Sequence, residues 1–173
     1  MRHSLRRLSQ PELRALAAGQ APPAHAARAE ADAWPPAFVA ARSLAQMADG
    51  RSADWCSTFV IERDRDRRIV GACGFKGEPE HGRVEIGYGV AAACRNTGVA
   101  GEAVALLLAI AGRQGARELL AEVNPENLAS TCVVRRAGFS EAGTRVDQEG
   151  ETVVQWLFRL REVVDDTSTD SAA

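Results

Sequence analysis

A short stretch of small and polar residues is the part of this sequence best suited to bind an anion. Residues 95–100 read Arg-Asn-Thr-Gly-Val-Ala and stand between a strand-like segment and a strongly apolar, helix-like segment. A turn that leads directly into a helix leaves several backbone N–H groups without partners inside the helix. These N–H groups and the helix dipole attract phosphate groups. Gly98 has no Cβ, so a pyrophosphate could approach the backbone closely.

The same pattern has a plainer interpretation. Strings of the form Arg-x-x-Gly-x-Ala arise often by chance, and small residues at a helix start also serve packing. The turn therefore has to be interpreted together with the elements around it.

Two elements must position this turn. Residues 83–90 alternate between apolar side chains and glycine or glutamate, which is the period of a strand with two unlike faces. Glu85 falls on the same face of that strand as Gly87 and Gly89. After the turn, apolar residues from Ala100 to Ala111 recur at i, i+3, i+4, i+7, i+8 and i+11, as expected of a helix packed on a sheet.

The rest of the chain predicts a mixed α/β (α+β) fold. The first third reads as helical, and the centre and end read as strands interrupted by helices. We expect one domain over residues 1–161 and a disordered, acidic, Ser/Thr-rich tail over residues 162–173. The remaining predicted helices are 10–18, 37–48 and 128–137, and the predicted strands are 58–62, 69–75, 119–123, 139–146 and 152–160.

Composition narrows the class of protein. The chain is 46% hydrophobic and 25% charged, which is typical of a folded globular protein. Its net charge of -2 and lack of a long basic block disfavour binding to nucleic acid. The longest apolar run, 103–111, is far short of the roughly 20 residues that cross a bilayer. No apolar stretch follows the basic N-terminus, so we expect no signal peptide, no membrane contact and a cytoplasmic location.

The cysteines do not form a recognisable metal or disulfide pattern. No pair has C-x-x-C spacing, and the histidines do not cluster with them. We therefore predict no metal site, and we interpret Cys56, Cys73, Cys94 and Cys132 as small buried thiols in a reducing compartment.

Three blocks in the order found here resemble the GNAT acetyltransferase superfamily. They read Glu-Ile-Gly-Tyr-Gly-Val at 85–90, Arg-Asn-Thr-Gly-Val-Ala-Gly-Glu-Ala at 95–103, and Asn-x-x-Asn-x-x-Ser-x-x-x-Val-x-x-x-Gly-Phe at 124–139. The chain is similar in particular to the branch of ribosomal-protein N-terminal acetyltransferases, from about residue 58 to 160. The resemblance implies a mostly antiparallel central sheet flanked by helices.

The resemblance also implies an acetyl-CoA site. The backbone of the 95–100 turn would hold the pyrophosphate, the backbone near Val90 would pair with the pantetheine arm, and Asn127 would hydrogen-bond that arm where two strands separate. An ordinary helix cap is the other interpretation of Asn127. Asn96 and Thr97 depart from the family, which usually has glycine and a basic residue there, but Asn tolerates a left-handed backbone. The implied cofactor-binding residues are Val90, Arg95, Asn96, Thr97, Gly98, Val99, Ala100 and Asn127.

Two residues are candidates for proton transfer. Glu85 would act as a base, through water, on the ammonium form of the acceptor, and Ser130 would protonate the departing thiolate. The resemblance also implies that a backbone N–H near Gly89 or Val90 stabilises the oxyanion. Structural interpretations stay open for both side chains: Glu85 could pair with a basic residue, and the Ser130 hydroxyl could bond a helix carbonyl.

The sequence thus predicts an acetyl-CoA-dependent N-acetyltransferase in which a primary amine attacks the thioester directly. The alternative is a catalytically silent acyl-CoA-binding sensor or scaffold. The acceptor stays open between a protein N-terminus and a small-molecule amine, and a homodimer is expected only by analogy. Residues 20–50, the loop 77–82 with His81, and the final hairpin are the segments expected to shape the acceptor site.

Overall fold

A single seven-stranded sheet forms the centre of the computed structural model, which describes residues 2–160. The expected tail at 162–173 lies outside the described residues. The strands follow the spatial order β1-β2-β3-β4-β5-β7-β6, and β4 with β5 is the parallel pair in an otherwise antiparallel sheet. The expected mixed, mostly antiparallel fold is therefore confirmed.

The elements follow the predicted order closely. The strands are β1 (His3–Arg7), β2 (Thr58–Arg63), β3 (Ile69–Phe75), β4 (Arg83–Val90), β5 (Glu118–Val123), β6 (Ser140–Val146) and β7 (Thr152–Arg159). The α-helices are α1 (Gln10–Ala17), α2 (Ala37–Ala48), α3 (Ala53–Cys56), α4 (Val99–Arg113) and α5 (Leu128–Arg136), and short 3₁₀ turns are η1 (Ala26–Arg28) and η2 (Ala92–Cys94).

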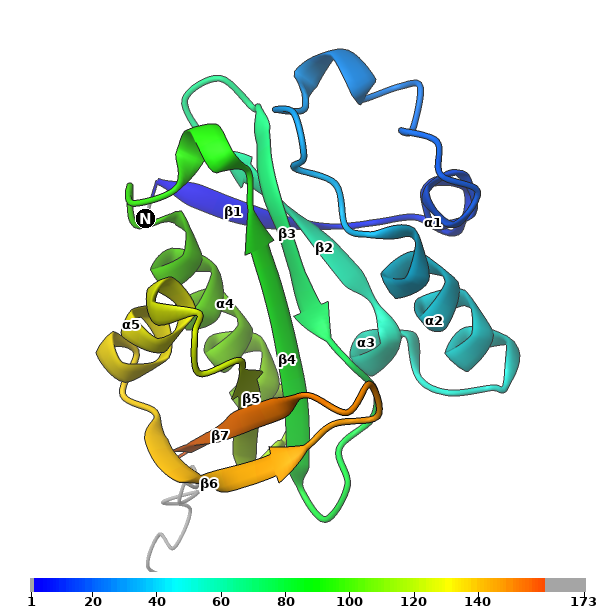
Figure 1. Cartoon of the computed structure of the whole chain (residues 1–173). Coiled ribbons are helices and arrows are strands. Elements are labelled where there is room, and N and C mark those ends of the chain that lie inside the picture. Colours follow the sequence, from blue (N-terminus) through cyan, green and yellow to red (C-terminus); the bar gives the residue numbers. More distant parts are fainter. Residues whose placement is uncertain (1, 161–173) are drawn as a thin grey trace, which may run out of the picture.

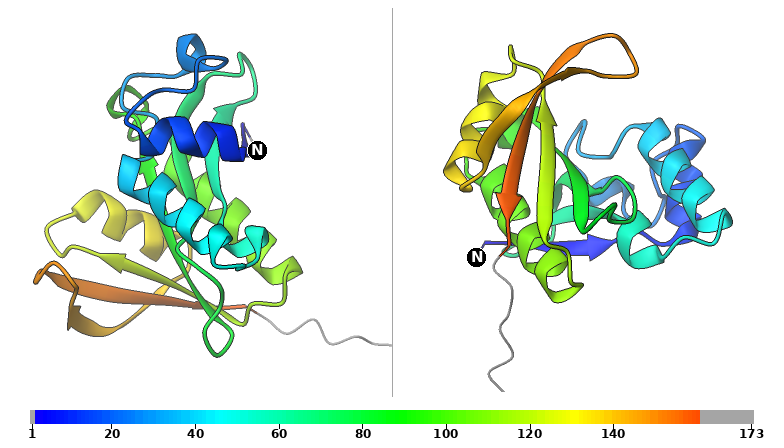
Figure 2. Two further views of the ribbon diagram at one scale, coloured as in Figure 1. Left: turned by 90° about the vertical axis from the view of Figure 1, so that its right-hand side faces the viewer. Right: turned by 90° about the horizontal axis from the view of Figure 1, so that it is seen from below.

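Helices cover both faces of the sheet. Figure 1 shows α4 and α5 on one side of β4 and the helices α1 and α2 on the other, and the second view in Figure 2 separates the same two groups. The predicted apolar stripe of α4 is buried against the sheet at Ala103, Val104, Leu107 and Ala111. The hydrophobic effect on this stripe holds α4 in place, so the start of α4 is fixed beside the end of β4.

The N-terminus is where the sequence prediction was wrong. Residues 3–7 form an edge strand that pairs antiparallel with β2, although the first third of the chain reads as helical. The segment is too short for an alternation of apolar and polar residues to predict a strand. Only its pairing with Phe59–Arg63 makes it one. The one-turn helix α3, capped by Ser52, was not predicted either.

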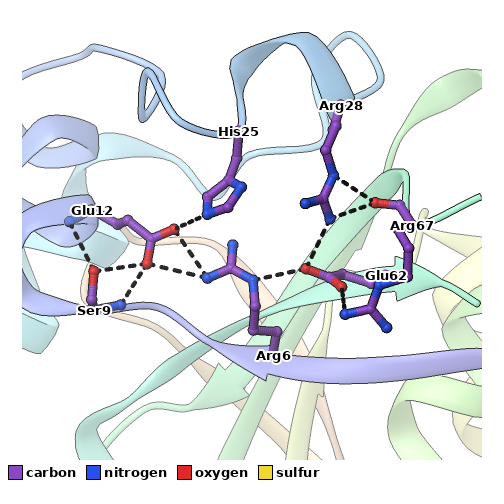
Figure 3. A network of polar contacts seen from close by, with 7 residues as sticks. All are labelled: Arg6, Ser9, Glu12, His25, Arg28, Glu62 and Arg67. Carbon is purple, nitrogen blue, oxygen red and sulfur yellow. Dashed lines mark hydrogen bonds and ion pairs between the residues drawn. The ribbon is translucent and has the colours of Figure 1, made fainter.

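An ion-pair network fastens β1 to α1 and to the β2–β3 turn (Figure 3). The side chain of Glu62 is 1% exposed, and its carboxylate lies 2.7 Å from Arg6 Nε and 2.6 Å from an Arg67 nitrogen. Arg28 approaches the same carboxylate at 3.4 Å, and Arg6 also pairs with Glu12 at 3.0 Å. A buried carboxylate is tolerated only when it is paired. The ion pairs between these arginines and Glu62 therefore hold the N-terminal segment against the sheet.

The cysteine prediction holds for three of the four residues. Cys56, Cys73 and Cys94 are buried free thiols, and burial raises the pKa of Cys73. Cys132 is exposed on α5, which corrects the expectation. Within residues 2–160, no helix has both the length and the apolar character to span a membrane.

Candidate active site

The pairing between β4 and β5 stops half-way along β4. It runs from Arg83 opposite Glu118 to Ile86 opposite Ala121 and goes no further. Beyond that point β5 pairs with β7 on its other side as far as Val123, and the β5–β7–β6 part of the sheet swings away from β4 (Figure 1). The last four residues of β4 therefore border a gap in the sheet.

Alternate backbone groups of β4 face this gap. In an antiparallel ladder, the groups of successive residues point alternately toward and away from the partner strand. The N–H of Lys76 donates to the Glu85 carbonyl at 2.8 Å, and the N–H of Ala91 donates to the Val70 carbonyl at 2.9 Å. The odd-numbered residues of β4 thus bond β3, and Tyr88 and Val90 direct their backbone toward the missing partner.

The turn after β4 has the left-handed backbone that the sequence predicted for it. Asn96 has φ 60° and Gly98 has φ 88°. The Thr97 hydroxyl donates to the Cys94 carbonyl at 2.6 Å, and Arg95 Nε donates to the Val90 carbonyl at 3.3 Å. These bonds fold residues 94–98 into a compact loop that ends at the N-terminus of α4.

The start of α4 is open to a ligand. Gly98 is its N-cap, and no side chain caps the first turn. A Cβ built on Gly101 would meet nothing within 4 Å, and one on Gly98 would meet only an Arg2 guanidinium nitrogen at 3.9 Å. Unpaired N–H groups at an uncapped helix start bind anions. The Arg2 guanidinium lies near the turn, where Thr97 supplies no charge, and it pairs with Glu102 of the first turn of α4 at 3.6 Å.

A cavity of about 700 Å³ lies on the face of β4 that carries Glu85. The residues before α2 and its first turns form one wall, and the turn between β6 and β7 forms another. The lining residues are Asp32, Ala33, Trp34, Pro35, Pro36, Phe38, Val39, Arg42, Thr58, Ala72, Cys73, Gly74, Phe75, Lys76, Glu85, Gly87, Tyr88, Gly89, Val90, Arg95, Glu122, Arg145, Asp147, Gln148 and Glu149.

Charged side chains meet on the floor of this cavity. Lys76 donates a hydrogen bond to Glu85 Oε1, and the Arg145 guanidinium binds Glu122 through two hydrogen bonds of 2.5 and 2.6 Å. Burial raises the pKa of Glu122, but hydrogen bonds from Arg145 and Gln155 and the charges of Arg145 and Lys76 outweigh it, so the net pKa is lowered. Glu122 is therefore a carboxylate at neutral pH.

The candidates on α5 lie on its first turn, away from the cavity lining. Asn127 is the N-cap of α5, and its side chain accepts a 3.0 Å hydrogen bond from the Ser130 N–H. The Tyr88 hydroxyl donates to the Ser130 carbonyl at 3.3 Å. Burial raises the pKa of Tyr88, and the contact with Ser130 opposes part of that shift. This contact connects β4 to α5 across the gap.

The predicted residues fall into three groups in space. Glu85, Val90 and Arg95 line the cavity, residues 96–100 form the turn and the start of α4, and Asn127 and Ser130 lie at the start of α5. The second and third groups do not line the cavity. Glu85 is paired with a basic residue, and Asn127 is a helix cap. Each residue therefore has the structural role that the sequence offered as the alternative to a role in the site. His81 lies in an exposed turn with φ 52° and does not line the cavity.

Sequence reasoning missed the basic residues of the cavity. Lys76 follows a buried strand, and the register that places it beside Glu85 could have been derived from a β3–β4 antiparallel pair. Arg42 lies inside a predicted helix, but apolar residues occur almost all round this helix, so the sequence does not tell which side faces the sheet. Glu122 and Arg145 come together only because β6 joins the sheet next to β7.

These features are those of a known enzyme family. Residues 2–140 match the family described as acetyltransferase (GNAT) domain. The match covers far more than half of the chain, so the protein belongs to the GNAT acetyltransferases. The predicted resemblance is confirmed, although the match begins at residue 2 rather than near residue 58. No curated protein sequence matches the chain.

Solved structures of the same fold are numerous. A protein of the GNAT acetyltransferase family from Chromobacterium violaceum is 26% identical, with a TM-score of 0.62 over 92% of this chain and 83% of that one. A ribosomal-protein-S5-alanine acetyltransferase from Vibrio fischeri is 13% identical, with a TM-score of 0.64 over 92% and 93%. RimL, a ribosomal L7/L12 α-N-protein acetyltransferase in complex with coenzyme A, is 16% identical, with a TM-score of 0.67 over 94% and 96%.

Proposed function

We propose that this protein transfers an acetyl group from acetyl-CoA to a primary amine. The observation that carries the proposal is the juxtaposition of an uncapped helix start with a gap in the sheet. The helix start suits a pyrophosphate, and the gap in the sheet suits an extended arm that pairs with the edge of β4. Coenzyme A contains both parts, and the structure of RimL holds coenzyme A.

The residues present fit this cosubstrate. The N–H groups at 99–101 would meet the phosphates, because no side chain caps them, and the Arg2 side chain lies close enough to Gly98 to add a contact while it pairs with Glu102. The backbone of Tyr88 and Val90 would pair with the arm, because β5 has left that edge. Acetyl-CoA supplies an activated thioester, so the protein needs no covalent intermediate of its own.

The protein's own groups then have to remove a proton from the amine and stabilise the negative charge that forms on the thioester oxygen. An alkylammonium has a pKa near 10, so a base must help to produce the neutral amine at pH 7. Glu85 lines the cavity, and its Oε1 accepts from Lys76. A carboxylate has further lone pairs, so Glu85 could still take the amine proton through water. The Val90 N–H faces the gap and would stabilise negative charge on the thioester oxygen.

Two hydroxyl groups compete for the role of acid toward the departing thiolate. Ser130 is the candidate from the sequence, and Tyr88 is the candidate that the structure adds, since it lines the cavity and contacts the Ser130 carbonyl. Burial raises the pKa of Tyr88, so its hydroxyl keeps its proton over the whole neutral range. A protonated hydroxyl at this place is suited to general acid catalysis.

Thermal unfolding tests the cofactor site first. A ligand at 100 times its Kd adds about 2.7 kcal/mol to the free energy of unfolding, which is about 5 °C or more in Tm for a domain of this size. We expect this shift with acetyl-CoA and CoA and none with NADPH or ATP. Release of the CoA thiol in the presence of an amine panel then tests turnover. A folded sample without a shift would overturn the cofactor site, and a shift without turnover would favour a silent acyl-CoA-binding module.

A further inference from the structure

A cluster of five charged side chains lines the cavity and contains one cation that has no carboxylate partner among residues 2–160. Its members come from α2, from the end of β3, and from β4, β5 and β6, and all of them line the cavity. Two form ion pairs with two others, Lys76 with Glu85 and Arg145 with Glu122. The cluster, called here the inner charge cluster, consists of Arg42, Lys76, Glu85, Glu122 and Arg145.

Arg42 is the unpaired member. Its Nε is buried and has no hydrogen-bond partner among residues 2–160, and its guanidinium forms no ion pair with a carboxylate in that part of the chain. Burial lowers the pKa of Arg42, and the nearby Glu85 charge opposes part of the shift. Arginine keeps its proton in proteins. A buried polar atom without a hydrogen-bond partner is costly, so the protein holds the Nε of this half-buried arginine at a free energy cost.

The acidic residues at the cavity rim do not neutralise Arg42. Asp32 accepts from the Ala92 N–H at 3.3 Å, and Asp147 accepts from the N–H groups of Glu149 and Glu151 at 2.9 Å each. Asp32 and Glu149 are exposed to solvent, where water and salt screen their charges. Neither they nor the two carboxylates of the inner charge cluster form an ion pair with Arg42 among residues 2–160.

We propose that Arg42 binds a carboxylate of the acceptor, so that the substrates are amines that carry a carboxylate group. This inference rests on the proposed function and specifies its acceptor. An arginine binds a carboxylate through two parallel hydrogen bonds, and such a group gives Arg42 the partner that it lacks. Arg42 and Glu85 line the same cavity, so a carboxylate bound at Arg42 keeps the attached ammonium in the cavity that holds the base candidate. Polyamines and aminoglycosides have no carboxylate for Arg42 to bind.

Matched pairs of amines test the proposal directly. Alanine, leucine and phenylalanine are each compared with their primary amides, and release of the CoA thiol gives kcat/KM. The amide has the more acidic ammonium, so intrinsic reactivity favours the amide, and a preference for the acid has to come from the enzyme. We expect at least one amino acid to exceed its amide by about 10-fold or more, because a hydrogen bond to a charged group contributes about 1.5–3 kcal/mol.

The variant Arg42→Met keeps the length of the side chain and removes the charge. We expect the preference for the acid to fall to within about threefold while the amide changes by less than threefold. Arg113→Met, an exposed arginine at the end of α4, is the matched control and should keep the preference. Arg42→Gln provides a second variant, and a Tm within a few degrees of the parent shows that each variant is folded. An unchanged preference in both folded Arg42 variants would overturn the proposal.

The outcomes separate this inference from the proposed function. Equal turnover of acids and amides would overturn the role of Arg42 and leave the acetyltransferase intact. Calorimetric binding of the acids in the presence of CoA, lost in Arg42→Met and without turnover, would support the carboxylate site and contradict the transfer reaction. If neither acids nor amides bind or react, the inference fails.

Discussion

Lys76 and Glu85 are joined twice, once through their side chains and once through the backbone. The Lys76 ammonium binds Glu85 Oε1, and the Lys76 N–H donates to the Glu85 carbonyl at 2.8 Å. The two residues lie opposite each other, Lys76 directly after β3 and Glu85 on β4, and both line the cavity. The base candidate is therefore held in one position by its neighbour, which is what proton transfer to a fixed site requires.

Glu85→Gln should lower kcat by about 100-fold or more, since the amide cannot accept a proton. The change also breaks the ion pair, so Lys76→Met serves as a second variant that breaks the same pair and keeps the carboxylate. We expect less than a tenfold loss for Lys76→Met. Glu141→Gln, an exposed residue of β6, is the surface control. A kcat within twofold of the parent for Glu85→Gln would remove this residue from the mechanism.

Ser130→Ala and Tyr88→Phe together decide which hydroxyl protonates the thiolate. If Ser130 is the acid, Ser130→Ala lowers kcat about 100-fold and Tyr88→Phe has a smaller effect. The reverse order assigns the role to Tyr88. Ser130→Ala keeps the contact between the two residues, because Tyr88 meets Ser130 at its carbonyl and not at its hydroxyl, whereas Tyr88→Phe removes that contact. Activity within twofold for both variants would contradict general acid catalysis by this pair.

Gly98→Ala should weaken acetyl-CoA binding. Alanine at φ 88° costs about 1 kcal/mol or more of backbone strain, and its methyl group would stand among the N–H groups at the start of α4. Gly19→Ala is the matched control, because Gly19 has φ 75°, open space around it and a place beyond α1. Both variants should lose similar stability without ligand. The Tm shift caused by acetyl-CoA should shrink only in Gly98→Ala, and an equal shift in the two variants would argue against a phosphate site at this turn.

Glu12→Gln should remove a pH-dependent part of the stability. Burial raises the pKa of Glu12, but hydrogen bonds from Ser9 and Arg6 and the Arg6 charge outweigh it, so the folded pKa is lowered. The stabilisation is therefore present above the unfolded pKa near 4.3 and is lost as the pH falls through the folded value. Glutamine still fits the capping box with Ser9, so mainly the charge is lost.

Urea unfolding at pH 7 and at pH 3 measures this effect. We expect the variant to be less stable than the parent by roughly 1 kcal/mol at pH 7 and nearly equal to it at pH 3. A difference that stays constant between the two pH values would mean that the loss comes from packing and not from the charged contacts drawn in Figure 3.

The sequence predicts the elements with their own periodicity and misses what depends on pairing between distant segments. The helix at 37–48 and the strand at 83–90 have the predicted bounds, because each carries its pattern within itself. The strand at 3–7 was missed because only its partner β2 defines it. The left-handed backbone at Asn96 was expected from the family resemblance, which usually has glycine there, and asparagine tolerates that backbone.

The same distinction holds for the site. Glu85 and the 95–100 turn are local features of one strand and one loop, so the sequence could locate them. The partners that give Glu85 its surroundings come from α2, β3 and β6, and their approach depends on the order of strands in the sheet. The missing partner of the Arg42 Nε is visible only when all the neighbours of this residue are known.

The gap beside β4 leads to an unusual pattern of amide hydrogen exchange. Gly87 and Gly89 bond β3, so their amide hydrogens should exchange slowly, whereas those of Tyr88 and Val90 have no strand partner and should exchange quickly. A strand in the middle of a sheet would then have amide hydrogens that are unprotected from exchange at every second residue. Acetyl-CoA bound along that edge should close the missing half of the ladder, so protection would rise at Tyr88 and Val90 and stay unchanged between them. The central strand would thereby report occupancy of the site residue by residue, without any turnover.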